Sequence, residues 1–260
     1  MRFRENAICI RTTDYSETSQ VVHFFTRNQG TVKLLAKGTK RPKSKTGGMI
    51  DLLADGDLVY SSSGRDTLGT LMEFSETTCN SLLRKDAARL SAALYMIELA
   101  GEMFHESDPH PEAFDLLHNA LARLSQEGSP VDAVLAYFQW RLLEHCGLLG
   151  NLSQCVSCSQ KIAAIGEAVP PQSSSKEQKK VVYFSSTQGG LLCGSCGASI
   201  AEKLAVADSA LTGLAVLLAV KAGKKAALPQ TQAQAINRLL AYHIAYQLGK
   251  RPKMAKHAIG

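Results

Sequence analysis

Aromatic residues are scarce in this chain of 260 residues: they make up 6% of it, and a single one is tryptophan. Long apolar runs are missing too, since the best of them, Leu211–Val220, is too short to cross a bilayer. The first residues, MRFRENAICIRTTDY, contain a glutamate where a signal peptide needs an apolar stretch. We therefore expect a soluble, cytoplasmic protein with no membrane partner.

The sequence also lacks the motifs of common enzyme classes. It contains no glycine-rich loop with a lysine for phosphates, no nucleophile elbow and no pair of carboxylates set for acid–base chemistry. His243 lies on an apolar helical stripe, which predicts a hydrogen-bonded core residue rather than a ligand. We therefore expect no enzymatic activity.

Short runs with strand-like alternation fill the first eighty residues, separated by turn-forming Gly, Asn, Asp and Ser. Gly30 can take a positive φ and close a tight hairpin between the second and third runs. Because an open sheet of this size would expose two edges, we expect closure into a small barrel or sandwich. Five strands are predicted, within residues 7–13, 19–27, 30–38, 56–62 and 65–78.

Helical spacing replaces this alternation after Cys79. Ser129 and Pro130 predict the start of one helix, and Gly147 predicts its end. The expected architecture is a multidomain α+β protein: an N-terminal OB-fold barrel at 1–80, then an all-α domain at 81–260. Apolar residues three and four apart predict helices within residues 84–104, 111–128, 129–147, 208–222 and 230–248.

Seven cysteines are present, and three of them, Cys9, Cys79 and Cys146, stand alone in apolar surroundings that predict buried packing. The other four form two Cys-x-x-Cys pairs, separated by a stretch whose polar segment 170–180 predicts a mobile loop. Two such pairs favour one structural zinc ion per chain in a closed tetrahedral site, within a subdomain at about 150–200, over a redox dithiol. The predicted ligands are Cys155, Cys158, Cys193 and Cys196.

A catalytic zinc site is the alternative for these residues. His110 and Glu112, followed by Cys155 and Cys158, partly match the pattern of zinc-dependent nucleobase deaminases. However, no proline precedes Cys155, and the second cysteine pair would have no role. A closed structural site is therefore the preferred interpretation.

The net charge of +6 is concentrated in one stretch, Arg27–Lys45, which contains no acidic residue. On an OB-type barrel, a basic loop of this kind suits a phosphate backbone, and sparse aromatics predict electrostatic, sequence-independent binding. Phe24, Phe25 and Tyr15 are the nearby aromatics, of which at least one phenylalanine is expected in the core. The candidate DNA-binding residues are Arg27, Lys33, Lys37, Lys40, Arg41, Lys43 and Lys45.

Taken together, these features resemble the bacterial RecO family of DNA repair and recombination mediators. The matching stretches are AICIRTTDYSETSQVVHFFTRNQGTVKLLAKGTKRPKSK, FQWRLLEHCGLLGNLSQCVSCSQK, YFSSTQGGLLCGSC and LLAYHIAYQLGKRPK, at residues 7–45, 138–161, 183–196 and 239–253.

The resemblance implies an N-terminal OB-fold, a C-terminal helical domain and binding to single- and double-stranded DNA. It further implies annealing of complementary strands and, with RecR, loading of RecA onto DNA covered by single-strand binding protein, whose tail contacts the helical domain. An OB-fold, zinc-containing RNA-binding module of the translation apparatus stays open as an alternative, as does the deaminase.

Overall fold

The computed structural model describes residues 1–40, 48–62, 68–78, 81–162, 181–221 and 227–260. The predicted mobile segment 170–180 and Cys79 lie outside these ranges. Contacts divide the chain into unit 1, Met1–Val131 with Pro252–Ala258 and Gly260, and unit 2, Asp132–Arg251 with Ile259. The barrel strands end and the helices begin near residue 80. That this point is also a domain boundary stays a prediction.

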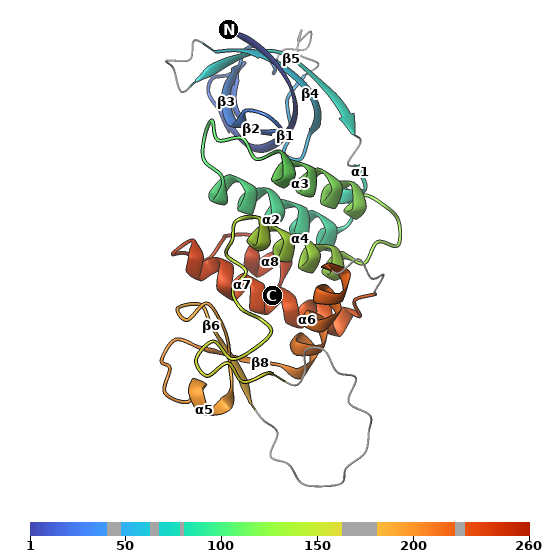
Figure 1. The fold of residues 1–260 in the computed structure, drawn as a ribbon. Helices are drawn as coiled ribbons and strands as arrows, with labels where there is room; N and C mark the ends of the chain where they lie inside the picture. Colours follow the sequence, from blue (N-terminus) through green and yellow to red (C-terminus); the bar gives the residue numbers. More distant parts are fainter. Residues whose placement is uncertain (41–47, 63–67, 79–80, 163–180, 222–226) are drawn as a thin grey trace. The chain divides into compact units, whose positions relative to one another are not determined.

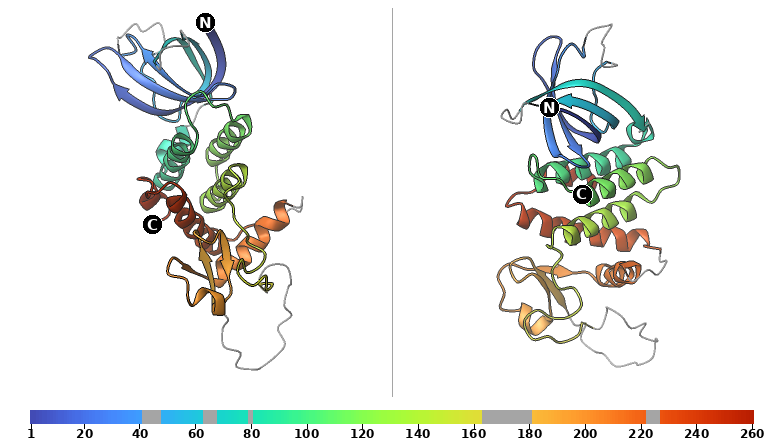
Figure 2. Two further views of the ribbon diagram at one scale, coloured as in Figure 1. Left: turned by 60° about the vertical axis from the view of Figure 1, so that its left-hand side comes forward. Right: turned by 45° about the horizontal axis from the view of Figure 1, so that its top comes forward.

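Unit 1 begins with a closed barrel whose strand order is β1-β2-β3-β5-β4. Every pairing is antiparallel except β3 with β5, which is parallel. Figures 1 and 2 show the strands curving around a common interior. The predicted OB-like barrel is confirmed, with its first strand starting earlier than expected. The strands are β1 (Arg2–Asp14), β2 (Gln20–Thr26), β3 (Gly30–Ala36), β4 (Asp55–Ser61) and β5 (Gly69–Thr78).

Alternation along each strand fills the barrel interior. On β2 the inward residues Val22 and Phe24 are fully buried, and on β3 Leu34 is 1% exposed. The hairpin between β2 and β3 turns at Gly30, whose φ is 65°. A Cβ there would stand 2.4 Å from the carbonyl oxygen of Asp108, so this position requires glycine for two independent reasons.

Two helices of unit 1 pack against the outer face of the barrel. Phe25 of β2 lies 5.4 Å from Phe104 and 6.0 Å from Phe114, measured between ring centroids. Asp55, a buried aspartate on β4, accepts a hydrogen bond from the Nδ1 of His118 at 2.7 Å. Burial raises the pKa of the Asp55 carboxyl group. The barrel contacts come from α2 (Ala87–Met103) and α3 (Pro111–Leu124), and the other two helices, α1 (Ser81–Lys85) and α8 (Ala255–Ala258), pack on α2.

Helix starts follow local chemistry in two places and depart from it in a third. Asp86 caps α2 by accepting hydrogen bonds from the backbone N–H groups of Ala88 and Arg89. Pro111 opens α3 at its first helical position. The helix predicted to start at Ser129 and Pro130 does begin there, at Val131, but the buried Ser129 hydroxyl has no hydrogen-bond partner among the described residues and so does not cap it.

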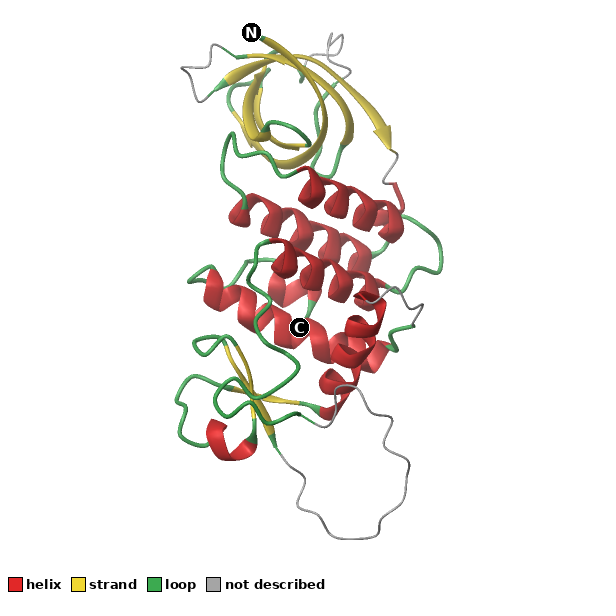
Figure 3. Cartoon of the chain, in the orientation of Figure 1, coloured by secondary structure: helices red, strands yellow, loops and turns green. Residues whose placement is uncertain are grey.

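Unit 2 combines helices with a small second sheet, drawn in red and yellow in Figure 3. A buried polar contact joins two of the helices, because the Gln139 amide donates to the Asn237 side chain at 2.8 Å. Among the described residues, no helix has the length and apolar character to cross a membrane. The elements are α4 (Val131–His145), β6 (Val182–Ser185), β7 (Gly190–Leu192), α5 (Gly194–Gly197), β8 (Leu204–Val206), α6 (Asp208–Lys221) and α7 (Gln230–Gln247), with sheet order β7-β6-β8.

Candidate metal centre and nucleic-acid interface

Two separate backbone segments bring the four paired cysteines together. The first pair lies in a turn closed by the bridge between Gln154 and Lys161. That turn joins β7 through a hydrogen bond from the Val156 N–H to the Leu191 carbonyl at 2.9 Å. The second pair follows β7 directly, with Cys193 preceding α5 and Cys196 within it. The small sheet therefore brings the two cysteine pairs together, as their spacing in the sequence predicted.

The thiol groups form one compact cluster. All four Sγ atoms lie within 4.8 Å of one another, and Cys158 and Cys193 are separated by 3.9 Å. A tetrahedral zinc with Zn–S bonds of about 2.3 Å requires neighbouring sulfurs about 3.8 Å apart. The cluster thus has the composition and spacing for a closed four-thiolate site.

Backbone donors favour the thiolate form of Cys155. Burial raises the pKa of Cys155, but N–H groups of Cys193, Cys158 and Ser157 outweigh that effect and bring it to about 6. A thiolate is the form that binds zinc, so the surroundings of Cys155 suit a metal ligand. At Cys196 the Ser157 hydroxyl lowers the pKa, but the neighbouring thiols of Cys193 and Cys158 outweigh it and raise the pKa. By contrast, burial is the main cause that raises the pKa of Cys9, as expected for a packed, unreactive thiol.

The cysteine-bearing segment is anchored to α7 by a carboxylate. Glu202 accepts hydrogen bonds from the Ser185 hydroxyl at 2.7 Å, from the Thr187 N–H at 3.0 Å and from the Tyr242 hydroxyl. Burial raises the pKa of Glu202, but these donors prevail and lower it to about 2. The segment is therefore held by a charged group that stays ionised at neutral pH.

His243 completes this anchor from within the core. It is 2% exposed, and its Nε2–H donates to the Leu148 carbonyl at 2.6 Å while Nδ1 accepts from the Ser186 hydroxyl at 3.0 Å. The predicted hydrogen-bonded core histidine is confirmed. His110, the histidine of the deaminase alternative, pairs with Asp108 at 3.1 Å and packs against Phe104, with the two rings tilted by 43°.

The candidate DNA-binding residues have different surroundings. Arg27 makes two hydrogen bonds of 2.9 Å to the carboxylate of Asp115 on α3. Lys40 lies 2.7 Å from a carboxylate oxygen of Asp14. Lys33 is half-buried on β3 and Lys37 is exposed just beyond that strand. Arg41, Lys43 and Lys45 lie outside the described residues.

One glutamine binds described residues on both sides of segment 41–47, namely Thr39 before it and Ile50 after it. The buried side chain of Gln20 accepts hydrogen bonds from the Ile50 N–H and the Thr39 hydroxyl, both at 3.2 Å. Lys40 adds a backbone hydrogen bond to the carbonyl of Thr18 at 3.2 Å. The flanks of this segment therefore start and end beside the turn between β1 and β2.

Two further basic residues, missed from the sequence, continue this surface. Cross-strand pairing puts Arg11 of β1, His23 of β2 and Lys33 of β3 in one row on the outer face of the barrel. Arg11 reaches that face because the register shifts between Cys9 and Arg11, where Ile10 is the extra residue. No local sequence signal marks such a bulge. We call Arg11, His23, Lys33 and Lys37 the basic row.

The pKa of His23 depends on its neighbours in this row. Burial lowers the pKa of His23 first, and the positive charges of Arg11 and Lys33 lower it further, against a smaller opposite effect of Glu106. Arg11 and His23 also border a groove of about 620 Å³ whose other side carries Glu98, Glu102 and Glu106. Those carboxylates would repel phosphates from the groove, so an anion would lie over the strands instead.

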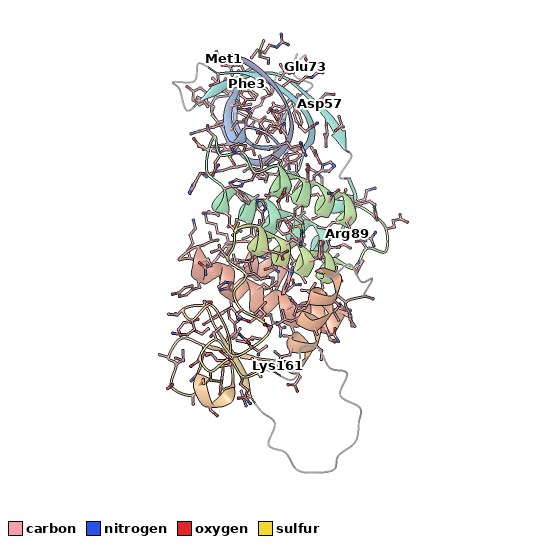
Figure 4. All side chains as sticks on the ribbon, in the orientation of Figure 1. Met1, Phe3, Asp57, Glu73, Arg89 and Lys161 are labelled. Carbon is pink, nitrogen blue, oxygen red and sulfur yellow. The ribbon has the colours of Figure 1, made fainter. Side chains whose placement is uncertain are left out.

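A second groove on the barrel carries both charge signs. It has a volume of about 380 Å³ and is lined by Arg2, Phe3, Arg4, Val59 and Glu73. Figure 4 labels Phe3 and Glu73 on the barrel strands. Glu73 opposes the two arginines there, so this groove, like the one beside Arg11 and His23, carries charges of both signs.

The three aromatic residues near the basic stretch differ in their exposure to solvent. Phe24 and Phe25 are both fully buried, which confirms that phenylalanine here serves the core. Tyr15, in the turn between β1 and β2, is 64% exposed.

Two family models match successive parts of the chain. Residues 1–78 match the family model for the N-terminal part of recombination protein O, and residues 84–166 match the model for its C-terminal part. The chain belongs to the RecO family. Similar relatives support this assignment across nearly the whole length.

The DNA repair protein RecO of Anaeromyxobacter dehalogenans (strain 2CP-C) is 30% identical over 260 residues, covering 96% of this chain and 94% of the relative. RecO of Myxococcus xanthus (strain DK1622) is 28% identical, covering 97% and 95%. RecO of Bacillus pumilus (strain SAFR-032) is 29% identical, covering 81% and 74%. The resemblance inferred from the sequence is thus confirmed at the level of the family.

The cysteine cluster generates the first prediction. We expect one zinc ion per purified chain, and Cys155→Ser or Cys193→Ser should each lose that ion and lower the melting temperature, because each removes one of four ligands. Metal content by mass spectrometry and thermal melting are the measurements. Cys146→Ser, at a lone half-buried thiol, is the matched control and should keep its zinc. Full zinc content in both ligand variants would contradict the assignment.

Proposed function

We propose that this RecO-family protein binds single- and double-stranded DNA and anneals complementary single strands. The observation that carries the proposal is the basic row on the barrel, which leads from Arg11 and His23 to Lys33 and Lys37. Clustered cations on one face supply the affinity for a phosphate backbone and release its counterions. The relatives named as DNA repair proteins support the same reading.

Annealing follows from charge neutralisation. Two single strands repel each other through their phosphates, and a surface that binds both lowers this repulsion while their bases pair. Such a surface needs no base-specific groups, and the basic row offers cations rather than paired donors and acceptors in a fixed pattern. We therefore propose binding that is independent of sequence, with no enzymatic step.

The proposed DNA-binding set combines the residues predicted from the sequence with two that the barrel adds. Arg11 and His23 join the set. Arg27 and Lys40 stay in it, although Asp115 and Asp14 partly neutralise them. The predicted members are Arg27, Lys33, Lys37, Lys40, Arg41, Lys43 and Lys45.

Further partners are proposed from the family. With RecR, the protein would help to load RecA onto single-stranded DNA covered by single-strand binding protein, whose C-terminal tail would contact the helical part. Zn²⁺ bound by Cys155, Cys158, Cys193 and Cys196 would act as a structural staple. The proposed location is the cytoplasm, in association with the nucleoid.

Strand annealing tests this function directly. Complementary labelled oligonucleotides, bare or coated with single-strand binding protein, should pair faster when the purified protein is added, as followed by energy transfer between the labels. Complementary RNA strands serve as the comparison. Acceleration confined to RNA would support the RNA-binding alternative, and no acceleration of either would contradict the proposal.

The basic row should set the salt dependence of binding. Arg11→Ala, Lys33→Ala and Lys37→Ala combined should weaken binding to unrelated single strands alike. The slope of log affinity against log salt should shrink by about 2 units, at about 0.7 per lost phosphate contact. Fluorescence anisotropy over a salt series measures both quantities. Lys161, Arg238 and Arg251, three exposed cations of unit 2, form the control set with the same change in net charge. An equal loss from both sets would assign the effect to net charge alone.

His23 should make DNA affinity depend on pH. Its pKa is lowered by burial and by Arg11 and Lys33, so it is neutral at pH 7 in the absence of DNA. A phosphate beside it favours the charged form, so affinity should rise as pH falls from 7.5 to 5.5, by roughly 2-fold to 5-fold, as for one exposed ion pair. Anisotropy titrations of His23→Gln should lose this rise, whereas His118→Gln should retain it. A pH profile unchanged in His23→Gln would remove His23 from the interface.

A further inference from the structure

Tyr15 is an exposed aromatic residue on a barrel whose other described aromatics are buried or partly buried. It is 64% exposed, whereas Phe24 and Phe25 are fully buried and Tyr60 is 3% exposed. Among the described residues of unit 1, it is the aromatic side chain with the largest exposure. An exposed ring on a barrel that also carries a row of cations offers a flat face on which a second flat group can stack.

The turn that carries Tyr15 is held in one conformation. The Tyr15 N–H donates to the Ser19 carbonyl at 3.1 Å, and the Ser16 N–H reaches the same oxygen at 3.3 Å. Lys40 binds the turn from the other side through Thr18 and Asp14. The ring is therefore presented from an ordered turn that Lys40, just beyond the end of β3, also contacts.

Charge divides this neighbourhood into two parts. The turn itself contains Asp14 and exposed Glu17, so it would repel a phosphate. The cations lie on the strands beside it, in the basic row, and at the start of the basic stretch at Lys40. A nucleic acid crossing this surface would thus set its phosphates on the strands and its bases toward the turn.

We infer that Tyr15 stacks on an unpaired base, and that this contact gives the site a preference for single-stranded over double-stranded DNA. The inference rests on the proposed DNA binding and names its substrate class. Bases inside a duplex already stack on their neighbours and present no free face, so only an unpaired base can meet the ring. The turn between the first two strands is also a ligand-binding loop of OB-type barrels in general.

Removing the ring should therefore weaken single-strand binding selectively. Tyr15→Ala should lose about 5-fold to 100-fold in affinity for a labelled single strand, the range of one stacked base, and change duplex affinity by less than about 2-fold. Tyr15→Phe keeps the ring and should bind as the parent protein does. Tyr137→Ala, at an exposed tyrosine on α4 of unit 2, is the matched control.

An abasic single strand provides the decisive comparison in the same anisotropy assay. It keeps the phosphates but offers no base, so the parent protein and Tyr15→Ala should bind it equally well. A loss in Tyr15→Ala that is equal for abasic, single-stranded and duplex DNA would overturn the stacking role, as would no loss at all. If the parent protein binds none of these DNAs, the proposed function itself fails, which is a distinguishable result. Thermal melting confirms that Tyr15→Ala is folded, since an exposed side chain contributes little to stability.

Discussion

Closure of the five-stranded barrel is the constraint on which the features of unit 1 depend. Because β3 pairs with β5 and β1 with β4, every strand has two neighbours, and side chains alternate between the interior and the outer face except where the register shifts, as between Cys9 and Arg11. The interior takes Phe24 and Leu34. The outer face of the same strands carries Phe25 toward the helices and His23 with Lys33 in the basic row. The same alternation thus provides one face for helix packing and a row of cations for the proposed DNA.

Two cations of the barrel, Arg27 and Lys40, form ion pairs that stabilise the fold. Arg27, at the β2–β3 hairpin, binds Asp115 of α3 through two hydrogen bonds and so helps to hold the barrel to its helices. Lys40 binds Asp14 and fixes the turn between β1 and β2. The basic row lies on the strands between these two fixed points. Some cations of this unit therefore stabilise the fold through ion pairs, and others form the basic row.

Polar contacts play the corresponding part in unit 2. The four thiols converge because the Cys155 turn pairs with β7, and Glu202 joins that small sheet to α7. A sheet of three short strands buries little apolar area, so a bound metal would supply stability that packing alone cannot. The cluster is accordingly best understood as part of the fold of this segment.

Local pattern determined most of the elements from the sequence alone. Two-residue alternation marked the five strands, Gly30 marked the hairpin, and the repeated cysteine spacing marked the ligand set. Periodicity and turn chemistry report on neighbours along the chain, which is why these features could be predicted. Tertiary structure alone decided the rest: the bulge at Ile10 that turns Arg11 outward, the clamp by Gln20, and the pairing of Arg27 with Asp115. Each of these depends on which distant residue a side chain meets, and that is settled only when the barrel closes and the helices pack against it.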